Sequence, residues 1–243
     1  MVIQKIKISR NIKSNSMKTR IIYLSIILLS ILFENKIFSQ TKEYIEVRDF
    51  ETWSSLALQY KIKKKLSFEL EEQLRLANNS TEIDQYFTNF QIDYKILKNW
   101  EFSSGFRYIK ANDPIGFKTN LRYNIDLSYD HKISNFDFQY RLRFQNKWEL
   151  PDFSIPKNQF RLKTSVEYNI KNWKLDPNLS FEIFKDNETG FMQSFDKYRF
   201  TLKTDYKIKK IGKIGAFYRI EHELNKTYPK TTYIVGLKFK YTF

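Results

Sequence analysis

The sequence predicts an all-β protein, an antiparallel up-and-down β-barrel of about 12 strands, with 10 strands as the alternative. Two patterns support this prediction. From Trp53 onward, apolar and polar residues alternate for ten or more residues at a time, without a helical stripe of period 3.6. A tyrosine also precedes each tight turn, at positions 60, 94, 129, 168, 206 and 241, so a hairpin unit repeats every 34 to 39 residues.

The expected strands follow from this alternation in chain order. The first is the weakest and lies in Glu43–Asp49, where Ile45 and Val47 alternate with charged residues. It is needed because six strands that lead into tight turns imply six that return; if Glu43–Phe50 instead folds into the lumen, the count falls. The remaining strands are expected at 53–62, 66–76, 86–96, 100–108, 121–129, 136–144, 160–170, 173–183, 198–208, 214–224 and 233–243.

Tight and longer connections are expected to alternate along the chain. The tight turns are placed at Lys63–Lys65, Lys98–Asn99, Ser134–Asn135, Lys171–Asn172 and Lys209–Gly212, and the longer loops at 78–83, 110–116, 146–158, 185–196 and 225–230. Short and long connections therefore gather at opposite ends of the barrel, and the C-terminus lies at the short-turn end.

Residues 1–40 differ from the rest and predict a leader. Lys18 and Arg20 precede the apolar run Ile21–Phe33, which at thirteen residues is shorter than the roughly 20 that a membrane-spanning helix needs. This pattern is typical of a secretory signal peptide, with cleavage expected near Ser39 or Gln40. A retained anchor helix is the alternative, and Met17 is an alternative start. Residues 41–243 would then form a single domain.

Composition narrows the class of protein. The 243 residues contain no cysteine, so no disulfide stabilises them, and the formal net charge is +15. Without residues 1–40, 35 basic residues remain against 26 acidic ones, a charge of +9. Such a charge can indicate nucleic-acid binding, but the export signal and the lack of a recognisable nucleic-acid motif argue against that partner.

The direction of the apolar face decides whether the barrel is soluble or transmembrane. The apolar face carries about fifty large side chains, more than the interior of a barrel this size can hold. Facing outward, each apolar strip has nearly the 9 to 11 residues that a tilted strand needs to cross a bilayer. A packed sandwich core is the alternative. Two residues fit the outward arrangement poorly: Glu72 on the lipid-facing side, and Pro177 within a strand.

Aromatic residues near the tight turns support a bilayer-spanning barrel, because aromatic side chains gather at the water–lipid boundary. The predicted interface residues are Tyr60, Tyr94, Trp100, Tyr129, Tyr168, Trp173, Tyr206 and Tyr241. The chain would therefore lie in the bacterial outer membrane, with membrane lipid as its partner.

The last strand resembles the C-terminal assembly signal of Gram-negative outer-membrane proteins, through Gly236, Phe239, Tyr241 and the final Phe243. That resemblance implies contact with the barrel-assembly machinery during insertion. The mature chain also resembles an exported family known as domain of unknown function 2490. The matching segments are Trp53, 72–76, 105–108, 140–143, 168–170, 197–199 and 241–243. The resemblance implies an outer-membrane β-barrel without a settled activity.

Catalytic chemistry is not expected. The chain has no cysteine and only two histidines, and no metal-ligand spacing, nucleotide motif or other cofactor signature is evident. Outer-wall lipid-modifying enzymes place a serine beside a histidine, and His222 is the single candidate for that role. No outward serine is expected beside it, so an enzyme of this kind remains a minor alternative.

The polar face predicts a charged lumen. Its candidate lining residues are Glu69, Glu71, Arg75, Arg107, Arg122, Asp126, Arg141, Arg143, Arg161, Lys163, Glu167, Arg199, Arg219 and Glu221. In the favoured interpretation these charges pair across strands and leave the lumen narrow or plugged. In the alternative, the arginines form a track for a small anionic solute or oligosaccharide, because guanidinium groups bind carboxylate and phosphate in a bidentate manner.

Overall fold

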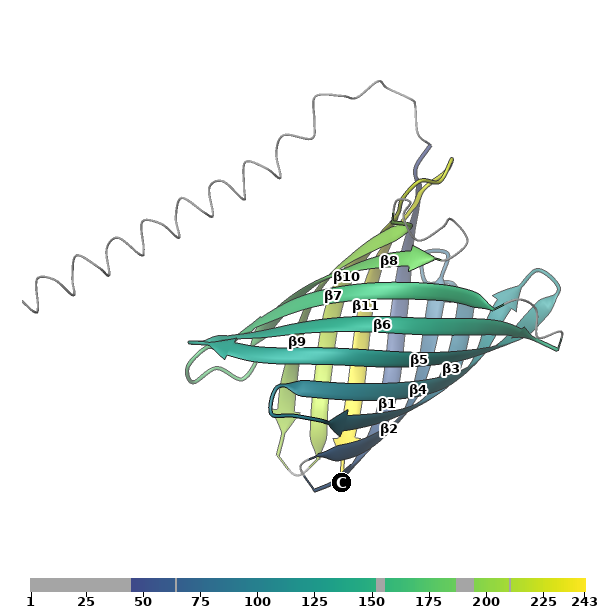
Figure 1. Ribbon diagram of the computed structural model, residues 1–243. Coiled ribbons are helices and arrows are strands. Elements are labelled where there is room, and N and C mark those ends of the chain that lie inside the picture. Colours follow the sequence, from purple (N-terminus) through teal and green to yellow (C-terminus); the bar gives the residue numbers. More distant parts are fainter. Residues whose placement is uncertain (1–44, 64, 152–155, 187–194, 210) are drawn as a thin grey trace, which may run out of the picture. The chain divides into compact units, whose positions relative to one another are not determined.

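The computed structural model describes residues 45–63, 65–151, 156–186, 195–209 and 211–243. In this part of the chain eleven strands form one closed β-barrel (Figure 1), which confirms the predicted all-β barrel. The strands are β1 (Val47–Ile62), β2 (Leu66–Ala77), β3 (Glu82–Lys95), β4 (Trp100–Asp113), β5 (Gly116–Ile133), β6 (Phe136–Leu150), β7 (Lys157–Tyr168), β8 (Pro177–Asp186), β9 (Lys197–Ile208), β10 (Gly212–Glu223) and β11 (Lys230–Thr242). The predicted leader and its cleavage site lie outside the described residues.

The predicted count of 12 strands is wrong, as is the alternative of 10. Val47–Asp49, assigned to a separate first strand, is the beginning of β1, because the chain continues extended into Trp53 without a turn. An odd number of strands that alternate in direction leaves the first and last pointing the same way. β1 therefore pairs in parallel with β11, from Val47↔Lys230 to Gln59↔Thr242, and the expected purely antiparallel barrel is also wrong. This pairing leaves no free sheet edge.

The connections between strands lie at the two ends of the barrel. At the short-turn end the backbones of successive turns bond to one another, and Phe243 N donates to Gln59 O, so the C-terminus lies there (Figure 1). The expected longer loop at 110–116 is wrong: β4 and β5 pair as far as Asp113↔Gly116, which leaves only two residues between them. Gly116 has a φ of 117°, a conformation that favours glycine.

The expected tight turn at Lys171–Asn172 is present, with Trp173 N donating to Ile170 O at 3.1 Å, but the strand expected to begin at Trp173 does not start there. β7 ends at Tyr168 and β8 begins at Pro177, so the residues between them form a longer loop that contains Trp173. The Trp173 indole donates to Leu175 O within this loop at 2.9 Å. Pro177, expected to interrupt a strand, begins one instead, a position where the missing N–H removes little ladder bonding.

Side chains are distributed with polar groups inside and apolar groups outside. Among the described residues only six hydrophobic side chains are buried, whereas 44 large hydrophobic side chains are exposed. Twenty polar or charged residues are buried. Glu72 lies exposed on the apolar outer face, as the alternation predicts. No helix in the described ranges is long and apolar enough to span a membrane.

The predicted interface aromatics lie on the outer surface towards the short-turn end. The ring centroids of Trp100 on β4 and Tyr129 on β5 are 4.9 Å apart. At the end of β11 the Tyr241 ring lies 4.8 Å from that of Phe243. Tyr60, Tyr94, Tyr168 and Tyr206 are exposed, as is Trp173 in its loop.

Candidate functional site

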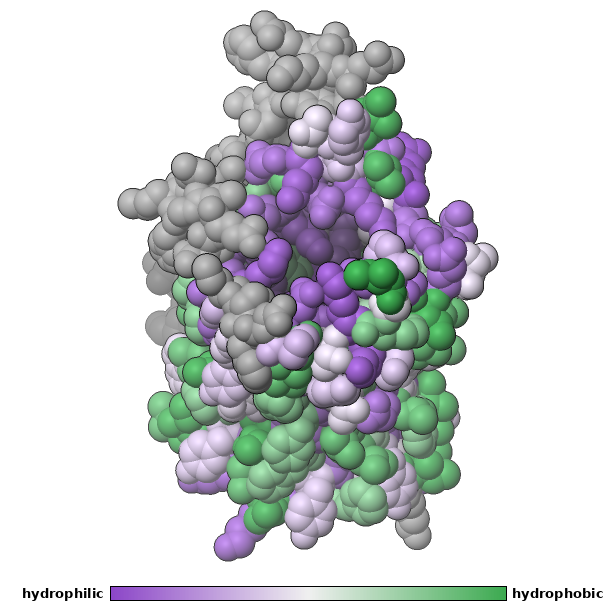
Figure 2. All heavy atoms as spheres, turned by 90° about the vertical axis from the view of Figure 1, so that its right-hand side faces the viewer, coloured by the Kyte–Doolittle hydropathy of each residue, from purple (hydrophilic) through white to green (hydrophobic). Residues whose placement is uncertain are grey.

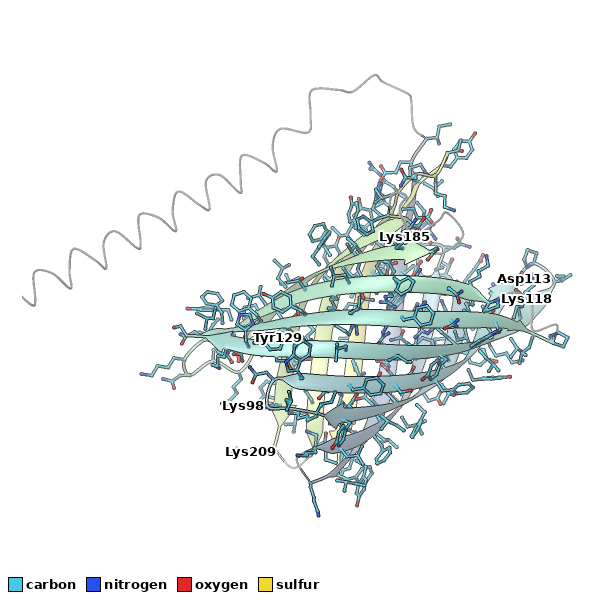
Figure 3. All side chains as sticks on the ribbon, viewed as in Figure 1. Lys98, Asp113, Lys118, Tyr129, Lys185 and Lys209 are labelled. Atoms are coloured by element: carbon cyan, nitrogen blue, oxygen red, sulfur yellow. The ribbon has the colours of Figure 1, made fainter. Side chains whose placement is uncertain are left out.

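The interior of the barrel contains a cavity of about 370 Å³ with a strongly cationic lining. Eleven arginine and lysine side chains line it, against only two carboxylates, Glu71 and Asp205. Figure 2 shows a hydrophilic hollow in the upper half of the face turned to the viewer, with hydrophobic residues below it. Figure 3 places Asp113 and Lys118 at one end of the barrel, and Lys98, Tyr129 and Lys209 at the other.

The structure places the fourteen predicted lumen residues on the inner face. Those that line the cavity are Glu71, Arg75, Arg107, Arg122, Arg141, Arg143, Arg161, Lys163, Arg199 and Arg219. The other four contact inward-facing partners: Glu69 with Lys238, Asp126 with Arg143, Glu167 with Asn178, and Glu221 with Arg199.

One part of the lumen wall is held together by ion pairs. Arg143 donates through Nε and Nη2 to the two carboxylate oxygens of Asp126, at 2.7 and 2.5 Å. Glu182, only 3% exposed, accepts from three guanidinium groups at 2.8 to 3.2 Å, those of Arg141, Arg161 and Arg199. We call Arg141, Arg143, Arg161 and Arg199 the paired arginines. Arg199 also pairs with Glu221, at 2.5 Å, so three carboxylates contact the four guanidinium groups and most of the buried positive charge is paired.

Four other arginines form no ion pair with a carboxylate of the described residues, and we call them the arginine arc: Arg75, Arg107, Arg122 and Arg219. The Nε of Arg75 donates to Gln73 at 2.8 Å, that of Arg107 to Asn89 at 3.1 Å, and that of Arg219 to Thr201 at 3.0 Å. All three acceptors are neutral oxygens. The Nε of Arg122 is buried without a hydrogen-bond partner. Neutral acceptors satisfy an N–H group but place no negative charge in direct contact with the guanidinium.

Inward-facing aromatic rings connect the members of the arc. The guanidinium carbon of Arg75 lies 3.5 Å from the centroid of the Trp53 ring, and that of Arg219 lies 4.8 Å from the same ring. The guanidinium carbon of Arg107 lies 3.6 Å from the Phe87 ring. Stacking of this kind is attractive because the face of an aromatic ring is negative, and it fixes the plane of each guanidinium.

The arc continues from β4 to β5, where Arg107 and Arg122 are direct register partners on the inner face. Like charges placed directly opposite each other on neighbouring strands destabilise a sheet. The four guanidinium groups thus follow one another along the wall, linked by the Trp53 and Phe87 rings and ending in the Arg107–Arg122 pair.

Sequence reasoning missed the inward aromatics. Trp53, Phe87, Phe184 and Phe217 all lie on the inner face, and each occupies a position with the parity of its polar neighbours. An apolar residue on the polar parity of a strand was the signal that could have identified them. Phe217 reaches across Gly236, where an added Cβ would lie 2.1 Å from the ring, and its ring meets that of Trp53 edge to face.

Both histidines lie on the outer face. The His131 ring stacks on Phe138 and Tyr140, with centroids 5.1 and 5.7 Å away. The His222 Nδ1 lies 2.6 Å from Thr231 Oγ1, and the Thr231 hydroxyl donates to the Glu46 carboxylate. Hydrogen bonds from Thr231 and Arg48 lower the pKa of Glu46, which keeps it an acceptor.

Comparison with known proteins identifies a family without indicating an activity. In the described ranges no group of three or more histidine or acidic side chains could hold a metal ion. A search of curated proteins found no match. The family model described as protein of unknown function (DUF2490) matches residues 50–232. This match covers most of the barrel, and the chain therefore belongs to the DUF2490 family of proteins of unknown function.

Proposed function

We propose that the chain is an integral outer-membrane β-barrel protein without enzymatic activity, whose charged lumen is narrowed by its own side chains. The observation that carries this proposal is the inverted distribution of side chains, with 44 large hydrophobic side chains exposed and six buried in the described residues. An exposed apolar surface of this extent is a liability in water, because monomeric soluble proteins rarely expose large contiguous apolar patches.

Strand length and closure support the same proposal. The strands have between 10 and 18 residues, and a tilted strand crosses a bilayer with about 9 to 11. The closed pairing of all eleven strands satisfies backbone N–H and C=O groups, which hydrocarbon cannot do. Residues 1–40 would act as the cleaved export signal.

The absence of enzymatic activity is supported by the surroundings of His222. To activate a nucleophile, a histidine must accept a proton from the attacking hydroxyl. The register partners of His222 on the two neighbouring strands are Tyr198 and Thr231, so no serine hydroxyl lies directly opposite it on either strand.

The lumen supports a narrow passage. The cavity of about 370 Å³ and a neighbouring one of about 220 Å³ share the side chains of Trp53, Arg75 and Arg199, which narrow the lumen between them. The ion pairs of Arg143 with Asp126 and of Arg141 with Glu182 occupy further space on the wall. The arginine arc favours a second candidate function, a small passive pore for anionic solutes.

Two measurements test the proposal. Expression of the full chain in a Gram-negative host, followed by fractionation, should give an outer-membrane protein that resists extraction by carbonate and begins near residue 40 or 41. Recovery in the soluble periplasmic fraction would contradict it. In planar bilayers the purified protein should show little or no conductance. Discrete anion-selective steps that shift when Arg141 and Arg143 are neutralised would favour the pore instead.

A further inference from the structure

We propose that the arginine arc is a binding site for a compact polyanion that carries two or more phosphate or carboxylate groups. This inference goes beyond the proposed function, and the two can fail separately. A barrel that inserts into membranes could lack the site, and a barrel that stays out of membranes could still bind the anion.

The absence of direct carboxylate contacts is the first argument. The fold brings a carboxylate into contact with each of the paired arginines, but gives three members of the arc only amide or hydroxyl oxygens and the Nε of Arg122 no partner. Charges drawn away from bulk water are costly unless they are paired. The same wall thus contains arginines in direct contact with a carboxylate and arginines whose guanidinium groups can take a carboxylate or phosphate from a ligand.

The orientation of the guanidinium groups is the second argument. In Arg75 and Arg107 the Nε proton is already bonded and one face of the group lies against an aromatic ring. Their terminal amino groups keep N–H donors for another acceptor. Planar, fixed guanidinium groups of this kind favour bidentate binding of phosphate and carboxylate.

The spacing of the arc favours more than one anionic group on the ligand. Arg107 and Arg122 lie directly opposite each other, and Trp53 lies beneath both Arg75 and Arg219. One oxyanion bridging each pair would remove the repulsion between neighbouring like charges.

Cavity size limits the ligand. A volume of about 370 Å³ lies near the lower end of the range of roughly 300 to 1,000 Å³ for small-molecule sites. It admits a diphosphate or a small tricarboxylate and excludes a folded macromolecule.

The test is a calorimetric titration of the full, folded protein in detergent with inorganic pyrophosphate, at constant ionic strength. We expect saturable binding that weakens at least tenfold in Arg107→Gln and in Arg75→Gln. The double variant Lys132→Gln/Asp137→Asn is the matched control, because it removes an ion pair joined at 3.0 Å that does not line the cavity, and its affinity should stay within threefold of the wild type. Citrate in a parallel titration separates a phosphate preference from a carboxylate preference, since either anion binding at the arc supports the site.

Three results would overturn the inference: no saturable binding of either anion, unchanged affinity in both arc variants, or equal weakening in the control. If an arc variant fails to fold, the unfolding temperature of the wild type alone tests the inference. Pyrophosphate should then raise its unfolding temperature more than sodium chloride does at equal ionic strength, and equal effects would contradict a specific site.

Discussion

Arg143 and Asp126 face each other directly across β5 and β6, and two hydrogen bonds join their guanidinium and carboxylate groups inside the barrel. Both side chains are nearly inaccessible, with 9% and 3% of their surfaces exposed. The pair therefore acts as a neutral unit, and its stability contribution depends on both members being present.

Removing only one member of this pair should destabilise the barrel more than removing both. We expect Asp126→Asn to lower the free energy of unfolding by about 3 kcal/mol, because it leaves the Arg143 charge uncompensated. The double variant Asp126→Asn/Arg143→Gln should recover much of that loss. Urea titrations followed by tryptophan fluorescence measure both values, and additive losses in the double variant would contradict the prediction.

The sequence predicts the outer and inner faces well because the alternation of residues is a local property of each strand. It does not predict the strand count, since the charged residues of Val47–Asp49 are compatible with either a separate strand or the start of β1. Closure in parallel with β11 is a long-range property that decides between them. The division of lumen charges into paired arginines and arc also depends on register and rotamer across strands, as does the stacking of Arg75 on Trp53.

Neighbouring glutamates on β2 should respond in opposite ways to the same substitution. Glu72 is exposed on the apolar outer face, whereas Glu71 faces inward and accepts from Lys238 Nζ at 3.0 Å. In lipid vesicles, Glu72→Leu should stabilise the barrel by about 1 to 2 kcal/mol, because a carboxylate leaves the lipid-facing wall. Glu71→Leu should destabilise it by about 1 kcal/mol, since it removes a charge-assisted hydrogen bond. Destabilisation by Glu72→Leu would argue that this wall faces water.

Gly236 should be required for the packing of Phe217. An added Cβ would lie 2.1 Å from the Phe217 ring, so Gly236→Ala must displace that ring. We expect a loss of about 1 to 3 kcal/mol, the usual cost of overpacking. Combining it with Phe217→Ala, which empties the space, should cost less than the sum of the two single variants in chemical denaturation. A strictly additive result would show that the ring and the glycine do not interact.

Arg122→Gln should stabilise the barrel when no anion is bound. The substitution removes one of two like charges placed opposite each other on β4 and β5, and we expect a gain of up to about 1 kcal/mol. Arg143→Gln is the matched control and should destabilise the barrel, because it leaves Asp126 unpaired. Unfolding at low ionic strength provides the comparison. A loss of stability in both variants would mean that the arc arginine is compensated after all.

The most direct test of the outward-facing apolar wall is a nitroxide scan along β6 in lipid vesicles. The chain has no native cysteine, so single cysteines at positions 140 to 144 can each carry one spin label. We predict that labels at Tyr140, Leu142 and Phe144 collide readily with oxygen dissolved in the hydrocarbon. Labels at Arg141 and Arg143 should instead be shielded from it. Oxygen accessibility without this two-residue period, or with the opposite phase, would contradict the account.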